Sequence, residues 1–193
     1  MNIAFVGKAG AGKTYLQKYL IENKGYAPAK MAYPVYMIAE KYLGMDPNKK
    51  DRKLLQYLGT DVARERISDN VWVDTFLMHT WVAQTTAKEL YGKELKFCSD
   101  DVRFKNEHDA LVDDGWVLIY LDVSDEIRIQ RLSSRDGDAQ VAHLGHRSET
   151  DIDIFKDECY QLDASGTVEQ AQERLDELLE HIQRERKGDE SQN

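Results

Sequence analysis

The residues with the clearest chemistry form one glycine-rich segment near the N-terminus. It reads Gly7-Lys8-Ala9-Gly10-Ala11-Gly12-Lys13-Thr14 and fits the pattern G-x-x-x-x-G-K-[ST] at every fixed position. In such a loop backbone N–H groups surround a phosphate, the lysine adds a positive charge near the β- and γ-phosphates, and the hydroxyl ligates Mg²⁺. We therefore expect this loop to bind ATP with Mg²⁺. The expected ATP contacts are Gly7, Ala9, Gly10, Ala11, Gly12, Lys13 and Thr14.

The segments on either side of this loop support that interpretation. Residues 2–6 are apolar and predict a buried strand, and residues 15–22 predict a helix. The N-terminus of that helix would direct its positive dipole end at the bound anion. A purely structural glycine turn is the alternative, but it explains neither Lys13 nor Thr14.

The rest of the chain alternates between apolar strands and helical patterns, which predicts an α/β fold with a mostly parallel sheet covered by helices on both faces. The predicted strands are 2–6, 95–99, 116–122 and 159–163. About 90 residues separate the first two strands, and amphipathic helical stretches near 35–43, 51–67 and 71–90 fill them. We expect a single domain with a core of 1–29 and 93–187, a helical insertion at 30–92, an amphipathic helix at 167–186 and a disordered tail at 188–193.

A second group of polar residues follows the strand predicted at 95–99. Because the carboxyl ends of parallel strands open onto the ligand crevice, we expect Asp101, Arg103 and Glu107 to face the phosphates. Asp101 would join Thr14 at the metal site or orient a phosphate, and Arg103 would bind a phosphate bidentately. Glu107 would reach the same side from a helix. The alternative is that these charges only solvate a strand end and a helix N-terminus.

These residues also carry a family resemblance. The chain resembles the phage-type deoxynucleoside monophosphate kinases, which have a phosphate-binding loop near the N-terminus and an Asp-x-Arg-x-x-x-Glu motif after a central strand. Further similar blocks are 59–64, with Asp69 and Trp72, and 146–149. The resemblance covers most of residues 1–150. It implies a three-layer P-loop kinase fold in which the insertion at 30–92 binds the acceptor nucleotide.

The block at 52–72 has chemistry that fits an acceptor site. A bound monophosphate would meet Arg64, while Asp61 or Asp69 would orient that arginine or accept a hydrogen bond from the deoxyribose 3′-hydroxyl. Trp72 and Tyr57 are candidates for stacking on the base. The alternatives are a solvated arginine and a core tryptophan.

Two further arginines lie on the helix that follows the strand at 116–122. Arg131 and Arg135 are one helical turn apart, at the base of a predicted lid spanning about 131–149. In small-molecule kinases such arginines neutralise the transferring phosphoryl group when the lid closes. We therefore expect Lys13, Asp101, Arg103, Arg131 and Arg135 to act in catalysis. Surface ion pairs with Asp125 or Asp136 are the competing explanation for the last two.

Composition narrows the function classes. The chain has 193 residues, 35 acidic against 26 basic, and a formal charge of −9, which disfavours a general nucleic-acid binder. Cys98 and Cys159 lack metal-ligand spacing, and we expect both to be reduced and buried. No apolar run approaches the ~20 residues of a membrane span. We expect a cytoplasmic protein, in the host cytoplasm if a phage encodes it.

The sequence as a whole predicts transfer of the γ-phosphoryl group of ATP to a deoxynucleoside 5′-monophosphate, with Mg²⁺. Its ligands would be small nucleotides, with neither nucleic acid nor membrane as a partner, and a homodimer is left open. Another small-molecule kinase, acting on dephospho-coenzyme A or a nucleoside, is the alternative within the enzyme class. A nucleotide-dependent switch or assembly ATPase is the alternative outside it.

Overall fold

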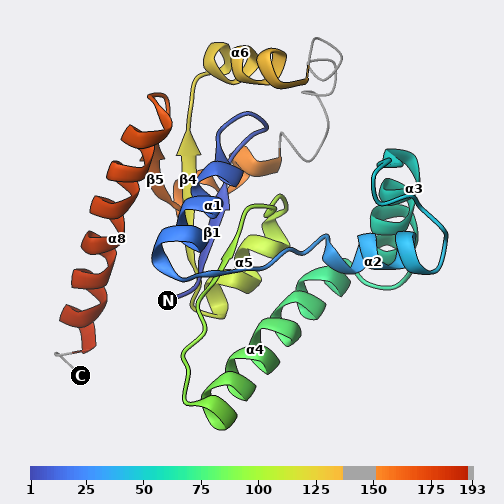
Figure 1. The fold of residues 1–193 in the computed structure, drawn as a ribbon, viewed down its shortest axis with the longest axis horizontal. Coiled ribbons are helices and arrows are strands. Elements are labelled where there is room, and N and C mark those ends of the chain that lie inside the picture. Colours follow the sequence, from blue (N-terminus) through green and yellow to red (C-terminus); the bar gives the residue numbers. More distant parts are fainter. Residues whose placement is uncertain (137–150, 191–193) are drawn as a thin grey trace.

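A five-stranded parallel sheet forms the centre of the molecule (Figure 1). The computed structural model describes residues 1–136 and 151–190, with only the backbone described at 135–136 and 189–190. The strand order is β2-β3-β1-β4-β5. The strands are β1 (Ile3–Val6), β2 (Ala27–Pro28), β3 (Phe97–Ser99), β4 (Val117–Asp122) and β5 (Tyr160–Asp163). Four of these lie within the strands predicted from the sequence, and β2 is an addition.

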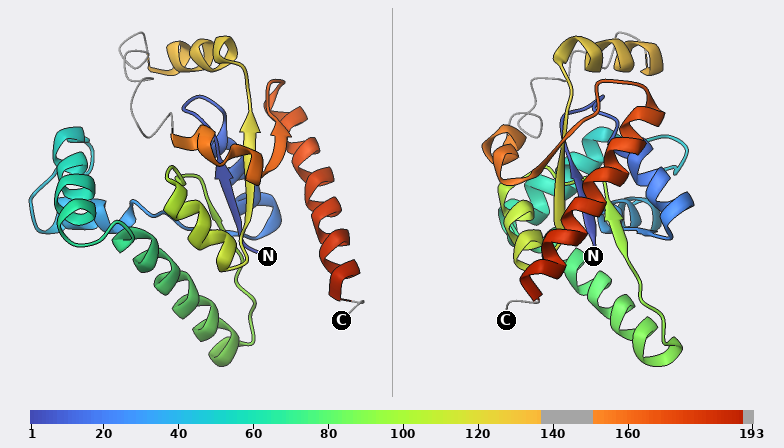
Figure 2. Two further views of the ribbon diagram at one scale, coloured as in Figure 1. Left: turned by 180° about the vertical axis from the view of Figure 1, so that it is seen from behind. Right: turned by 90° about the vertical axis from the view of Figure 1, so that its left-hand side faces the viewer.

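Helices connect the strands and cover both faces of the sheet (Figures 1 and 2). The α-helices are α1 (Lys13–Lys24), α2 (Tyr33–Lys41), α3 (Arg52–Gln56), α4 (Val71–Tyr91), α5 (Lys105–Asp113), α6 (Asp125–Asp136) and α8 (Val168–Glu190). The shorter elements are the π-helix η1 (Tyr57–Arg64) and the 3₁₀ helices η3 (Asp151–Ile154) and η4 (Lys156–Glu158). The last helix, α8, runs four residues past the end that the sequence predicted at 186, so that residues 188–190 of the tail predicted to be disordered are helical.

The alternation of side chains along β1 explains the layers. Ile3 and Phe5 point into one apolar cluster, which α1 and α8 complete, whereas Ala4 and Val6 point into another, which α4, α5 and η3 complete. All four of these side chains are fully buried. A strand buried on both faces is typical of a parallel sheet between two helical layers. The predicted three-layer α/β fold is therefore confirmed.

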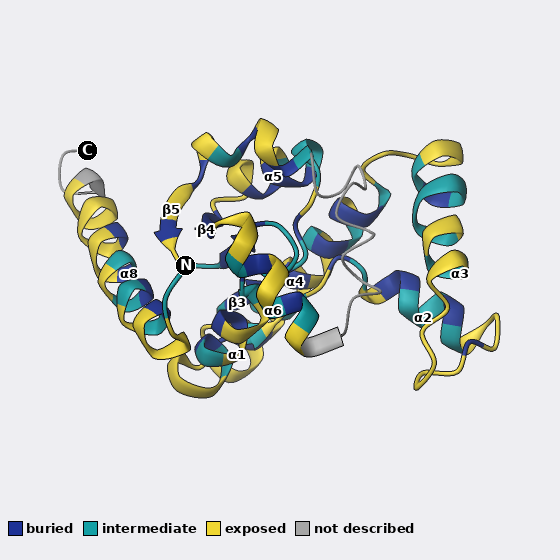
Figure 3. Ribbon diagram, turned by 90° about the horizontal axis from the view of Figure 1, so that it is seen from above, coloured by how far each residue is buried: buried dark blue, intermediate teal, exposed yellow. Residues whose placement is uncertain are grey.

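The helical insertion projects beyond one edge of the sheet, where α2, α3 and η1 pack on one another (Figures 1 and 3). A small apolar cluster built on Val35, Ala63 and Trp72 joins these elements to the start of α4. The sequence predicted one continuous helix over 51–67, but the structure has a short α-helix followed by a π-helix. Such wider turns occur often at functional sites.

The two cysteines are buried free thiols, as predicted. Burial raises the pKa of Cys98 and of Cys159 to about 12. Among the described residues, no helix is both long enough and apolar enough to cross a membrane.

Candidate active site

The glycine-rich loop lies between the end of β1 and the start of α1, where the sequence predicted it. Gly10 and Gly12 have φ angles of 82° and 103°, which favour glycine. A Cβ atom at Gly10 would lie 2.7 Å from the backbone oxygen of Arg128 on α6, so this approach also requires glycine. The buried Arg128 guanidinium donates hydrogen bonds to Ala9 O at 2.8 Å and to Asp125 at 2.6 Å. Helix α6 therefore fixes the shape of the loop from above.

Lys13 and Thr14 begin α1 and contact different neighbours. The Lys13 ammonium donates hydrogen bonds to the carbonyls of Gly7 and Lys8. The Thr14 hydroxyl donates one to Asp100 Oδ2 at 2.8 Å. The other oxygen of Asp100 forms an ion pair with Lys30 at 3.0 Å. A hydroxyl and a carboxylate thus lie side by side next to the phosphate loop, and Mg²⁺ prefers such oxygen ligands.

Asp101, the neighbour of Asp100, has another set of contacts. Its carboxylate accepts hydrogen bonds from the backbone N–H of Ala32 at 3.0 Å and from the Ser99 hydroxyl at 2.8 Å. The sequence paired Asp101 with Thr14, but the carboxylate that Thr14 contacts belongs to Asp100. The two aspartates are adjacent after one strand, so the spacing alone could not separate their roles. Sequence reasoning also missed Lys30, which precedes α2 and carries no motif.

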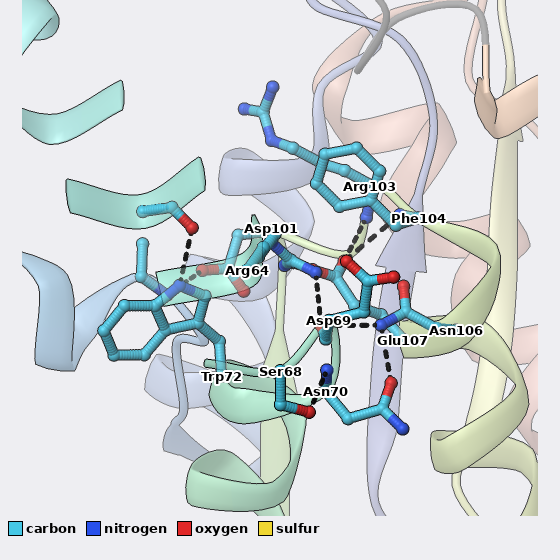
Figure 4. A network of polar contacts seen from close by, with 12 residues as sticks. Arg64, Ser68, Asp69, Asn70, Trp72, Asp101, Arg103, Phe104, Asn106 and Glu107 are labelled. Atoms are coloured by element: carbon cyan, nitrogen blue, oxygen red, sulfur yellow. Dashed lines mark hydrogen bonds and ion pairs between the residues drawn. The ribbon is translucent and has the colours of Figure 1, made fainter. Parts of the chain in front are cut away.

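Arg64 and Glu107 form the centre of a second polar network (Figure 4). Arg64 Nη2 pairs with Glu107 Oε1, and Arg64 Nη1 donates to the carbonyl of Asp69 at 2.9 Å. The guanidinium also lies 4.6 Å from the centre of the Phe104 ring. Glu107 Oε2 accepts from the backbone N–H groups of Arg103 at 2.7 Å and Phe104 at 3.2 Å. This network joins η1 of the insertion to the start of α5 in the core.

The electrostatics of this network are set by its burial. The Glu107 side chain is 3% exposed and that of Arg64 is 13% exposed. Burial raises the pKa of Glu107, while the positive charge of Arg64 and the two backbone donors act in the opposite direction. The carboxylate is therefore an orienting partner for the arginine, because its oxygens are already occupied by donors.

The remaining predicted acceptor residues lie around this network. Asp69 contributes its backbone carbonyl, while the residue is exposed and outside the cavity lining. Asp61 on η1 is half-buried and also lies outside that lining. Trp72 is 8% exposed, donates its indole N–H to Gly59 O at 2.9 Å and packs in the cluster with Val35. One edge of Trp72 still lines the cavity. Arg103 is exposed and lines the same cavity.

Arg131 joins the phosphate loop to the segment after β5. Its Nη2 donates to the carbonyls of Ala164 and Gly166, each at 2.9 Å, and its Nη1 lies 3.5 Å from Ala11 O. The ion pair with Asp125, considered for the lid arginines, is made by Arg128 instead. The side chain of Arg135 and most of the predicted lid, 137–149, lie outside the described residues.

A cavity of about 1250 Å³ connects these groups. One end is formed by the segment after β5, by α6 and by the glycine-rich loop, and the other by α2, η1 and the start of α5. Typical pockets for one small ligand measure roughly 300–1,000 Å³. This cavity is therefore large enough for two small molecules held end to end.

Solved structures of other proteins share this fold. No protein-family profile matches the chain. A gluconokinase from Sinorhizobium meliloti 1021 superposes with a TM-score of 0.54 at 15% identity, over 95% of this chain and 96% of the other. TT1252 from Thermus thermophilus gives 0.53 at 18% identity, over 94% and 97%. The chain has the P-loop kinase fold.

Relatives by sequence are viral. A protein of Acanthamoeba polyphaga mimivirus, described as "Putative deoxynucleotide monophosphate kinase", is 27% identical over 62% of this chain and 72% of its own length. The uncharacterized protein ORF77 of Ictalurid herpesvirus 1 (strain Auburn) is 26% identical over 92% of this chain and 70% of its own length. The resemblance stated from the motifs is confirmed, and the chain is a phosphotransferase of the P-loop kinase type.

Proposed function

We propose that this P-loop kinase transfers the γ-phosphoryl group of ATP to a deoxynucleoside 5′-monophosphate and releases two diphosphates. The observation that carries the proposal is the single cavity that contains the phosphate loop at one end and the buried Arg64–Glu107 pair at the other. Phosphoryl transfer requires mainly positioning and charge neutralisation, and both ends of this cavity present cations. The mimivirus relative supports a deoxynucleotide as the acceptor.

On the donor side, we propose that the glycine-rich loop and Lys13 hold the ATP phosphates. Thr14 and Asp100 would hold Mg²⁺, since their oxygens are 2.8 Å apart beside the loop. When bound, the ion would neutralise charge on the phosphate oxygens. We assign Asp101 a positioning role instead, because its carboxylate accepts a hydrogen bond from the backbone N–H of Ala32, which leads into the acceptor helices.

On the acceptor side, we propose that Arg64 and Arg103 bind the monophosphate. Glu107 fixes Arg64 in place, and Trp72 forms part of the wall that the base would contact. A phosphate acceptor oxygen is already largely ionised at neutral pH, so Asp101 and Glu107 orient groups and need not remove a proton. Arg131 holds the donor-side loops together, and Arg135 stays a proposed contact to the transferring phosphoryl group.

A panel of acceptors tests this function. Formation of ADP from ATP would be measured with each deoxynucleoside and ribonucleoside monophosphate, with dephospho-coenzyme A, with nucleosides and with gluconate, using Lys13→Ala as the blank. We expect activity with one or more deoxynucleoside monophosphates and none with acceptors that offer only a hydroxyl. Turnover confined to hydroxyl acceptors, or ATP hydrolysis that no small acceptor stimulates, would overturn the proposal.

A further inference from the structure

Lys30 is held at the bottom of the cavity by the backbone on both sides of it. The preceding N–H, of Ala29, donates to Cys98 O at 2.9 Å, and the N–H of Ala32 donates to Asp101 at 3.0 Å. The Lys30 side chain lines the cavity and is 49% exposed. The backbone at Lys30 is therefore fixed between the donor loop and the acceptor helices, while the flexible side chain lets the ammonium turn.

The partner of Lys30 is a nearly buried carboxylate. The Asp100 side chain is 5% exposed, and its two oxygens are shared between Thr14 at 2.8 Å and Lys30 at 3.0 Å. Burying an ionised carboxylate is unfavourable unless a cation or donors compensate it. Lys30 supplies that positive charge in this structure. A divalent cation held by Thr14 and Asp100 would supply the same charge to the same carboxylate.

We propose that Lys30 is a charge-exchange residue of the donor site. Its ammonium neutralises Asp100 before ligands bind, and it moves to the terminal phosphate of the bound nucleoside triphosphate when a divalent cation joins Asp100. This inference rests on the ATP-binding half of the proposed function and is independent of which acceptor is used. It assigns Lys30 a contact that only the triphosphate offers, because Asp100 lies beside Thr14, the residue whose hydroxyl is expected to ligate the ion bound to the last two phosphates.

Two opposite changes follow if Lys30 is replaced by an uncharged residue. A divalent cation alone would bind more tightly, since the competing ammonium is gone. The nucleoside triphosphate would bind more weakly, since its terminal phosphate loses a charged contact. A residue that only supports the fold would shift both affinities in the same direction, so this pairing of effects is diagnostic.

The experiment compares Lys30→Met, Lys30→Arg and wild type, with Lys24→Met as the matched control. Lys24 forms a similar ion pair, 2.9 Å from Asp176, away from the cavity. Binding of Mn²⁺ alone would be followed by electron paramagnetic resonance, and binding of ATP and of ADP by calorimetry with Mn²⁺ present. Thermal unfolding of each variant would show that the fold is intact.

For Lys30→Met we expect Mn²⁺ affinity without nucleotide to rise about two- to fivefold, the size of a half-exposed ion pair. ATP affinity should fall about 10- to 100-fold, as for a charge-assisted hydrogen bond, with ADP affinity within about twofold of wild type. Lys30→Arg and Lys24→Met should stay near wild type in both. Equal losses for ATP and ADP, or an unchanged or lower Mn²⁺ affinity, would overturn the inference. Failure of the acceptor panel would instead remove the proposed acceptor and leave these donor-side results unaffected.

Discussion

The two ends of the cavity are built in different ways. The donor end is a single stretch of chain, 7–14, whose conformation is set by glycines and by the Ala9 carbonyl, which accepts a hydrogen bond from Arg128 on α6. The acceptor end depends on one buried ion pair, between Arg64 on η1 and Glu107 on α5, which are 43 residues apart. Loss of the Lys13 side chain leaves the glycine conformations and the Arg128 hydrogen bond in place, whereas an end held by an ion pair loses position and charge together. Substitutions at the two ends should therefore fail differently.

The largest effect is expected at the donor end, and it should be purely catalytic. Replacing Lys13 by Ala should lower turnover about 10²- to 10³-fold, because a positive charge on the phosphates is lost. The unfolding temperature should stay near that of wild type. Steady-state kinetics at saturating ATP and a thermal melt measure both, with the exposed Lys18→Ala as control. Near-normal turnover would remove Lys13 from the site.

At the acceptor end, the first effect of a substitution should be on stability. Glu107→Ala leaves the Arg64 guanidinium buried without its carboxylate, and breaking such a pair costs about 3 kcal/mol of unfolding free energy. Denaturant unfolding measures this cost, and Asp109→Ala, an exposed position on the same helix, is the control. If Glu107→Ala unfolds at the same denaturant concentration as wild type, the two ends are not held differently.

Arg64 sharpens the comparison through kinetics. Arg64→Ala should lower kcat/KM for the acceptor about 10- to 100-fold, through loss of a charge-assisted phosphate contact, and leave ATP affinity unchanged. The exposed Arg66, two residues further along, provides the matched Ala control. A collapse of ATP affinity with acceptor affinity intact would move Arg64 to the donor side.

The core beneath both ends should respond to alkaline pH. The pKa of Cys98 and of Cys159 is raised to about 12 by burial, against about 8.5 in an unfolded chain. The stabilising contribution of the two thiols to the free energy of unfolding is complete below pH 8.5. It is lost as the pH rises towards 12, because over that range only the unfolded chain releases thiol protons. As the pH rises from 8.5 to 9.5, ionisation of each thiol in the unfolded chain should lower the free energy of unfolding by about 1 kcal/mol. Denaturant titrations of wild type and Cys98→Ala at several pH values measure how steeply the free energy of unfolding falls with pH. The fall should be shallower in the variant, and equal slopes would contradict the raised pKa of Cys98.

The sequence predicted the donor end of the cavity more fully than the acceptor end. The phosphate loop is contiguous, so its residue types and spacing define it without knowledge of the fold. The Arg64–Glu107 pair is not visible in the sequence, because only tertiary packing brings η1 against α5. The choice between Asp100 and Asp101 was likewise beyond the spacing, since a change of one residue after a strand redirects the side chain.

Two features of the fold escaped prediction for local reasons. Strand β2 is only Ala27–Pro28, at the sheet edge, where a proline without an N–H is tolerated and no apolar alternation marks the strand. The segment 51–67 was predicted as one helix, because a π-helix keeps helical composition and differs only in its hydrogen bonding. The long strands and helices with clear periodicity were predicted to within a few residues.

The central claim is that one cavity holds the donor and the acceptor end to end. The most direct measurement is calorimetric binding of a bisubstrate analogue, in which adenosine and a deoxynucleoside are joined through a chain of phosphates. We predict that it binds more tightly than ATP or a deoxynucleoside monophosphate alone, and that Lys13→Ala and Arg64→Ala each weaken it at least about tenfold. An analogue that binds no more tightly than ATP and is indifferent to Arg64→Ala would contradict the account.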